Sequence, residues 1–99
     1  MTNVYLERSG DKHTVMCQGH ATGSTEVCAA VSCLVCTLAN WLWMSHAEVL
    51  EERVKDADVL LCFKGAETAF DMVCVGFLLL ENSHSKYNKV NAKNISITG

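Results

Sequence analysis

The alternation of apolar and polar residues predicts two β-hairpins. Residues 3–8 (NVYLER) and 13–18 (HTVMCQ) each alternate with a period of two, and the SGDK between them is rich in turn-forming residues. Residues 48–55 (EVLEERVK) and 59–64 (VLLCFK), joined through DAD, form the second predicted hairpin. The last of these strands is apolar enough to lie in the centre of a sheet.

Each hairpin is followed by a segment with helical periodicity. We expect the first helix from about residue 26 to about 43, because apolar residues recur there at positions 27, 31, 34, 35, 38, 41 and 42. Because this helix is so apolar, we expect most of its circumference to be buried. The second helix lies within 66–85 and has Glu67 and Asp71 near its start, where the helix dipole favours anions. Gly76 in its middle costs about 1 kcal/mol against alanine, which indicates a close neighbour.

A short alternating segment at 94–97 (NISI) predicts a last strand. The resulting order is β-β-α-β-β-α-β. This order predicts an α+β fold, with a mostly antiparallel sheet and two helices packed on one face. We expect a single domain over residues 1–99, long enough to bury a core without a metal or a disulfide framework.

Composition narrows the class of protein. The opening MTNVYLERSG lacks the apolar core of a signal peptide, and five of the six cysteines lie in apolar segments, so we expect a cytoplasmic protein with reduced thiols. The apolar stretch 27–44 approaches transmembrane length, but Ser32, Thr37, Asn40 and the lack of flanking Lys or Arg favour a helix of a soluble protein. A net charge of -3 without a basic stripe argues against nucleic-acid binding.

Candidate chemistry is concentrated in residues 19–32 (GHATGSTEVCAAVS). Thr25 is a plausible N-cap and Glu26 an anion in the first turn, which places Cys28 at the third helical position. Unpaired amides and the positive end of the helix dipole stabilise a thiolate there, and the thiolate is the nucleophilic form of cysteine. The same amides can donate to an oxyanion that develops during acyl transfer.

His20 is the candidate base for this thiol. It stands at the end of a predicted strand, and a short loop leads from it to the helix that carries Cys28. Gly19 and Gly23 permit tight turns and the close approach of a substrate chain. Spacing alone leaves the alternative open that Cys28 is an ordinary buried helical cysteine.

The residues GHA, followed by VCAAVS at a helix start, resemble the corresponding motif of the ribosomal-processing cysteine protease family, also called Prp. The resemblance implies that His20 and Cys28 form a catalytic dyad, with Gly19, Ala21, Gly23, Thr25 and Ser32 as substrate-binding residues. It further implies a homodimer that needs no metal or other cofactor. Its partner and substrate would be the N-terminal extension of ribosomal protein L27, cut after a pair of aromatic residues.

Two departures from the family pattern support a competing hypothesis. The family usually has an aspartate where this chain has Thr25, and its loop between histidine and cysteine is usually longer by several residues. The alternative is a catalytically degenerate homologue that acts as a dimeric protein-binding module. Ser32 lies one turn beyond Cys28 and either lines the site or bonds back to its own helix.

The remaining cysteines and histidines have simpler interpretations. Cys33 and Cys36 form a CxxC, which we assign to core packing, with a redox pair as the alternative. Zinc binding by Cys17, His20 and Cys28 matches no common spacing. We expect Cys62 and Cys74 in the core, Trp41 and Trp43 in the core or a dimer contact, and three histidines at the surface: His13, His46 and His84.

Overall fold

The structure is a computed structural model that describes residues 1–19 and 24–93 of the 99-residue chain. Its elements are β1 (Thr2–Ser9), β2 (Lys12–Gln18), α1 (Thr25–Met44), β3 (Glu48–Lys55), β4 (Asp58–Lys64), α2 (Glu67–Ser83) and β5 (Asn88–Lys93). The predicted α+β fold and the predicted order of elements are confirmed.

The last strand was predicted in the wrong place. The structure has β5 at Asn88–Lys93, whereas the predicted segment 94–97 lies outside the described residues. The NKVNAK sequence of β5 contains only Val90 and Ala92 as apolar residues, so its periodicity gives little indication of a strand. Pairing with β1 holds this segment in the sheet.

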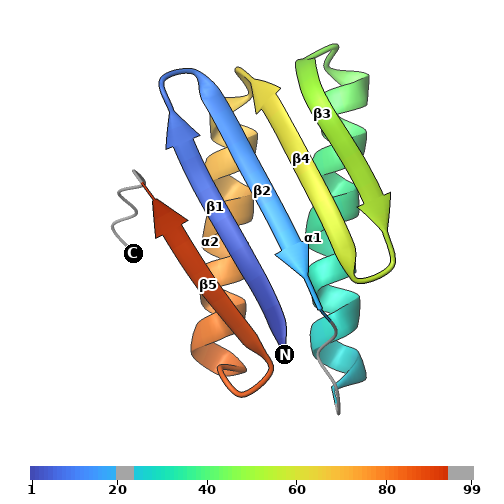
Figure 1. Cartoon of the computed structure of the whole chain (residues 1–99), viewed down its shortest axis with the longest axis vertical. Coiled ribbons are helices and arrows are strands. Elements are labelled where there is room, and N and C mark those ends of the chain that lie inside the picture. Colours follow the sequence, from blue (N-terminus) through green and yellow to red (C-terminus); the bar gives the residue numbers. More distant parts are fainter. Residues whose placement is uncertain (20–23, 94–99) are drawn as a thin grey trace.

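The five strands form one mixed sheet in the order β3-β4-β2-β1-β5. All pairs are antiparallel except β1 with β5, which run parallel. Both helices lie behind the sheet as viewed in Figure 1, with α1 on the side of β3 and β4 and α2 on the side of β1 and β5. The strand β3 therefore forms one edge of the sheet and β5 the other.

The core lies between the sheet and the two helices. Alternate residues of the three central strands point into it, including Leu6, Val15 and Leu61, all of which are fully buried. The helices contribute one stripe of buried residues each, which includes Leu38 in α1 and Phe70 in α2. Alternation in the strands and helical spacing in the helices thus meet in one apolar layer.

The first helix is less buried than its composition predicted. Only Val27, Val35, Leu38 and Leu42 are buried, so burial around most of its circumference was a wrong expectation. With a single sheet beneath it, α1 can bury only one face, and its outer face consists largely of small or uncharged residues. By length and composition α1 is also apolar enough to cross a membrane, with 22% of its most apolar window buried.

The prediction of a close neighbour at Gly76 is confirmed. A Cβ atom added to Gly76 would lie 2.6 Å from the Cδ2 atom of Leu34 on the facing helix. Glycine therefore lets α1 and α2 approach closely at this level, which offsets its low helix propensity.

His13 is buried, contrary to the expectation of a surface histidine. Its side chain is 0% exposed and lies between the rings of Phe63 and Phe70, with ring centroids 5.4 and 4.6 Å away. His13 shares the inward face of β2 with Val15 and Cys17, so the alternation of this strand contained the information. The surface position was predicted because His13 stands beside a turn in the sequence.

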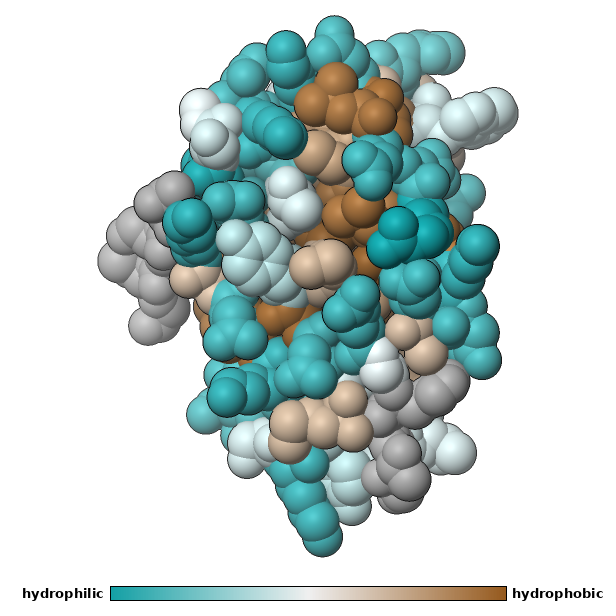
Figure 2. Space-filling model, in the orientation of Figure 1, coloured by the Kyte–Doolittle hydropathy of each residue, from teal (hydrophilic) through white to brown (hydrophobic). Residues whose placement is uncertain are grey.

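The tryptophans at the end of α1 are exposed. Trp43 is 80% exposed and Trp41 is 49% exposed, so neither belongs to the core. Figure 2 views the open face of the sheet and shows apolar surface over the β3 and β4 side, among hydrophilic side chains. Apolar surface therefore extends beyond the core towards this edge of the molecule.

Candidate active site

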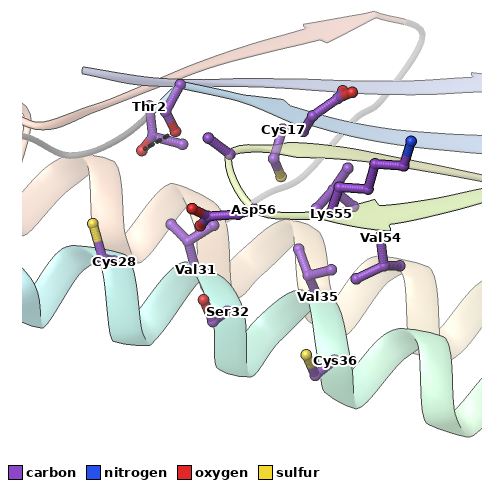
Figure 3. A pocket seen from close by; sticks show the side chains of 14 residues that line it. Thr2, Cys17, Cys28, Val31, Ser32, Val35, Cys36, Val54, Lys55 and Asp56 are labelled. Carbon is purple, nitrogen blue, oxygen red and sulfur yellow. Dashed lines mark hydrogen bonds between the residues drawn. The ribbon is translucent and has the colours of Figure 1, made fainter.

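A cleft of about 290 Å³ opens at the end of the sheet, beside the first turns of α1. Its walls come from α1, the end of β2 and the turn between β3 and β4. Figure 3 shows Cys28 and Ser32 on the helix, with Asp56 reaching towards them from the turn. The lining residues are Thr2, Cys17, Gly19, Cys28, Val31, Ser32, Val35, Cys36, Val54, Lys55, Asp56, Ala57, Asp58 and Val59.

The start of α1 is capped by Ser24 and not by Thr25 as expected. The Val27 amide donates to the Ser24 Oγ atom at 3.2 Å, and Ser24 has extended backbone angles. Ser24 occupies the N-cap position because its side chain reaches the third helical amide. Cys28 is consequently the fourth helical residue, and its own amide donates to the Ser24 carbonyl at 3.3 Å.

This correction changes which amides are open to a ligand. The amides of Val27 and Cys28 are both engaged with Ser24. Those of Thr25 and Glu26 donate no hydrogen bond within residues 1–19 and 24–93. The positive end of the helix dipole still faces this end of the cleft.

Gly19 anchors the end of β2 at the rim of the cleft. Its amide donates to the Ala57 carbonyl at 3.0 Å, and its carbonyl accepts from the Thr2 hydroxyl at 3.3 Å. Its φ of +91° lies in the region that favours glycine, and an added Cβ atom would lie 2.6 Å from the Met1 carbonyl oxygen. The close approach expected at Gly19 is therefore made by the chain's own first residue.

The turn between β3 and β4 forms the opposite wall. Ala57, the second of the two residues that join the strands, has a φ of 58°, as the second central residue of a type II turn requires. Arg53 bridges the base of the turn to Asp58 with two hydrogen bonds of 3.0 and 3.1 Å. The carboxylates of Asp56 and Asp58 lie in this cleft wall, far in sequence from Cys28.

The cysteines near the cleft differ in their surroundings. Burial raises the pKa of Cys17 to about 12, which keeps its thiol protonated at neutral pH. Cys28 is partly exposed at the rim of the cleft. Cys33 and Cys36 are both exposed, so the assignment of this pair to the core was wrong. Cys62 and Cys74 are buried as predicted.

The structure brings together three of the seven predicted site residues. Gly19, Cys28 and Ser32 line one cleft, whereas Thr25 is exposed and does not line it. His20, Ala21 and Gly23 lie outside the described residues. The contribution of the turn at 55–58 was missed, because nothing in its sequence indicates that it faces α1.

No group of three or more His, Cys, Asp or Glu side chains is arranged to hold a metal ion within residues 1–19 and 24–93. The polar groups of the cleft are thiols, hydroxyls, carboxylates and one lysine.

The fold is similar to that of a known ribosomal processing protease. It matches crystal structures of the essential ribosomal processing protease Prp from S. aureus, one in complex with a covalently linked product peptide and one with a substrate peptide. The TM-scores are 0.81 and 0.74, at 17% and 16% sequence identity. Each match covers 94% of this chain and 100% of the other. No protein-family model and no curated protein matches this sequence.

Proposed function

We propose that this chain is a cysteine endopeptidase that removes the N-terminal extension of ribosomal protein L27 in the bacterial cytoplasm, acting as a homodimer. The observation that carries the proposal is the position of Cys28 at the rim of a cleft beside a helix N-terminus. The similarity in fold to a ribosomal processing protease supports the choice of substrate.

The proposed reaction uses Cys28 as nucleophile and His20 as base. His20 takes the thiol proton, and the sulfur attacks the scissile carbonyl to form a tetrahedral intermediate. The C–N bond breaks, the leaving amine takes the proton from His20, and a thioester remains on Cys28. Water then attacks the thioester and gives a proton to His20. The C–S bond breaks to release the new carboxyl terminus, and His20 returns the proton to the Cys28 sulfur.

The oxyanion of the intermediate needs donors that are not already engaged. Because the Cys28 amide donates to Ser24, we assign this role to the amides of Thr25 and Glu26 in the first turn. Thr25 would then contribute through its backbone and not through its hydroxyl. Gly19 would position the strand end that leads to His20, Ala21 and Gly23, and Ser32 would contact the substrate from α1.

Substitution of Cys28 tests this function. Cys28→Ser should lower cleavage of a synthetic L27 N-terminal peptide by about a thousandfold or more, because the hydroxyl is a far weaker nucleophile than the thiolate. Cys33→Ser, an exposed cysteine on the same helix, serves as the matched control and should cleave at the wild-type rate. Equal activity in the two variants, measured by mass spectrometry of the products, contradicts the proposal.

The exposed apolar side chains on the helices favour a second candidate, a dimeric protein-binding module. Trp41 and Met72 line a hollow between α1 and α2, and Leu79 is exposed further along α2. Surfaces of this kind commonly mark association sites. If wild-type protein binds the L27 peptide but leaves it intact, and Cys28→Ser binds it equally well, the binding module replaces the protease.

A further inference from the structure

Within the described residues, the strand β3 has an unpaired edge. It is the last strand of the sheet next to β4, so alternate backbone N–H and C=O groups along its outer side have no strand to pair with. A register irregularity lies between Val49 and Glu51, but from Glu51 to Lys55 the pairing with β4 is regular. Five consecutive residues thus offer a straight edge to an extended chain.

The space between this edge and α1 is hollowed at both ends, and we refer to this space as the groove. Val49, Glu52 and Val54 pair with Phe63, Leu61 and Val59, three buried residues that face the helices, so these β3 residues point towards the helix layer as well. At one end, Val54 lines the cleft that contains Cys28. At the other end, Val49 and Glu52 line a hollow of about 700 Å³ with Trp43 and Met44.

The helix side of the groove is an uncharged stripe. Cys28, Ser32, Cys36, Asn40 and Trp43 follow one another at intervals of three or four residues, and so share a face of α1. At a rise of 1.5 Å per residue, this stripe extends for about 22 Å. That length accommodates about six or seven residues of extended chain.

The far end of the groove combines apolar surface with a negative charge. Trp43 and Met44 are 80% and 65% exposed beside Glu52. Glu48 is paired with Lys64 and Arg53 with Asp58, whereas Glu52 forms no ion pair with any residue that the structure describes. A lysine or arginine whose stem packs on the tryptophan would place its charge at Glu52.

We propose that this groove, defined as the space between α1 and β3 from Cys28 to Trp43, binds the substrate as an added sixth strand. The proposal rests on the proposed protease function and extends it with a substrate class: an extended peptide with a basic residue beyond the scissile bond. Antiparallel pairing is the more stable arrangement. Because β3 runs from Trp43 towards Cys28, an antiparallel substrate runs from Cys28 towards Trp43, and Glu52 contacts a residue downstream of the cut.

A charge swap tests the groove. The probes are two synthetic peptides with a pair of phenylalanines followed by either a lysine-rich or a glutamate-rich segment. Binding is measured on the full chain carrying Cys28→Ala, so that cleavage does not interfere. Glu52→Lys should weaken binding of the lysine peptide by about tenfold and strengthen binding of the glutamate peptide, and Glu52→Gln should give an intermediate result.

Glu51→Lys is the matched control for this experiment. Glu51 precedes Glu52 on the same strand but pairs with Cys62, so its side chain lies on the opposite face of the sheet. Glu51→Lys makes the same change in net charge as Glu52→Lys. It should leave both affinities within about twofold of the starting protein. Equal effects at the two positions would indicate general electrostatic attraction and overturn the groove.

Hydrogen exchange and cleavage separate the two proposals. The lysine peptide should protect β3 amides within 51–55 from exchange, and protection elsewhere only, or no binding of either peptide, overturns the added strand. Protection of β3 in the free protein that rises with concentration would mean that a second copy occupies this edge, which also overturns it. If the wild type and Glu52→Lys cleave the lysine peptide at the same rate, the protease proposal stands and the groove proposal is overturned. If the peptide binds with the expected dependence on Glu52 but the wild type does not cleave it, the groove proposal stands and the protease proposal is overturned.

Discussion

The two ends of the sheet contain similar residue types in very different surroundings. At one end His13 lies between Phe63 and Phe70, and Cys74 follows one turn later on α2. Burial is the largest cause that raises the pKa of Cys74, to about 12, and Asp71 adds to it. At the other end Cys28 borders an open cleft, in a segment that begins at Gly19 and includes His20.

This difference teaches that histidine and cysteine become candidates for catalysis through access. Burial lowers the pKa of His13, and the nearby Arg8 charge lowers it further, while Glu67, Asp71 and the Gly65 backbone act more weakly in the opposite direction. Neither ring nitrogen makes a hydrogen bond of standard geometry within the described residues. His13 is therefore held neutral in the core, whereas Cys28 is open to a substrate.

The largest effect on stability is expected at Gly19. Gly19→Ala combines an unfavourable positive φ with a Cβ atom 2.6 Å from the Met1 carbonyl oxygen, and should cost about 2–4 kcal/mol. Gly10→Ala at the opposite end is the matched control, because Gly10 also has a positive φ but no atom within 4 Å of the added Cβ. Urea denaturation of both variants checks this. Equal losses of stability would mean that the contact with Met1 is not made.

A smaller, pH-dependent effect is expected from His13. Its pKa is lowered in the folded state, so below the ordinary value of about 6.5 the unfolded chain binds a proton that the folded chain does not. The free energy of unfolding should be level above this pH and fall on acidification, by at most about 1.4 kcal/mol per pH unit.

The variant His13→Leu isolates this contribution. The difference between its pH profile and that of the wild type should show the loss of stability below about pH 6.5 only in the wild type. Urea denaturation from pH 5 to 8 provides both profiles. Parallel profiles would show that His13 titrates normally, and the contrast between the two ends would fail for histidine.

The smallest effect is expected at the start of α1. Ser24→Ala removes the acceptor for the Val27 amide and should cost about 1 kcal/mol, whereas Ser24→Asp should retain most of the stability. Thr25→Ala is the comparison that separates the observed cap from the predicted one. It should change the free energy of unfolding by only a few tenths of a kcal/mol. A larger loss from Thr25→Ala, measured by thermal denaturation, would restore Thr25 as the cap.

The sequence predicted the elements better than it predicted the site. Period-two alternation located β1 and β2, the apolar run of β4 indicated a central strand with β3 as its hairpin partner, and helical spacing located both helices. The strand β5 was missed because its buried side contains Asn88 and Val90, of which only Val90 is apolar. Ser24 and Thr25 are both good capping residues, so only the observed hydrogen bond distinguishes them.

The cleft itself depends on contacts between distant segments. Asp56 and Ala57 line the same cleft as Cys28 only because β3 and β4 form a hairpin that ends beside the start of α1. The exposure of Cys36 similarly follows from there being one sheet and no second layer beyond α1. Local periodicity contains neither fact, whereas the proposal of Cys28 as a nucleophile follows from its position near a helix start.

The most direct test of the account is the rate at which each cysteine reacts with iodoacetamide as a function of pH, measured by mass spectrometry. Cys33 and Cys36 are exposed on the same helix and serve as internal references. We predict that near pH 7 Cys28 reacts at least about tenfold faster than either reference, and that His20→Ala removes this advantage. A Cys28 that reacts no faster than Cys33 and Cys36, with or without His20, would contradict the assignment of Cys28 as the nucleophile.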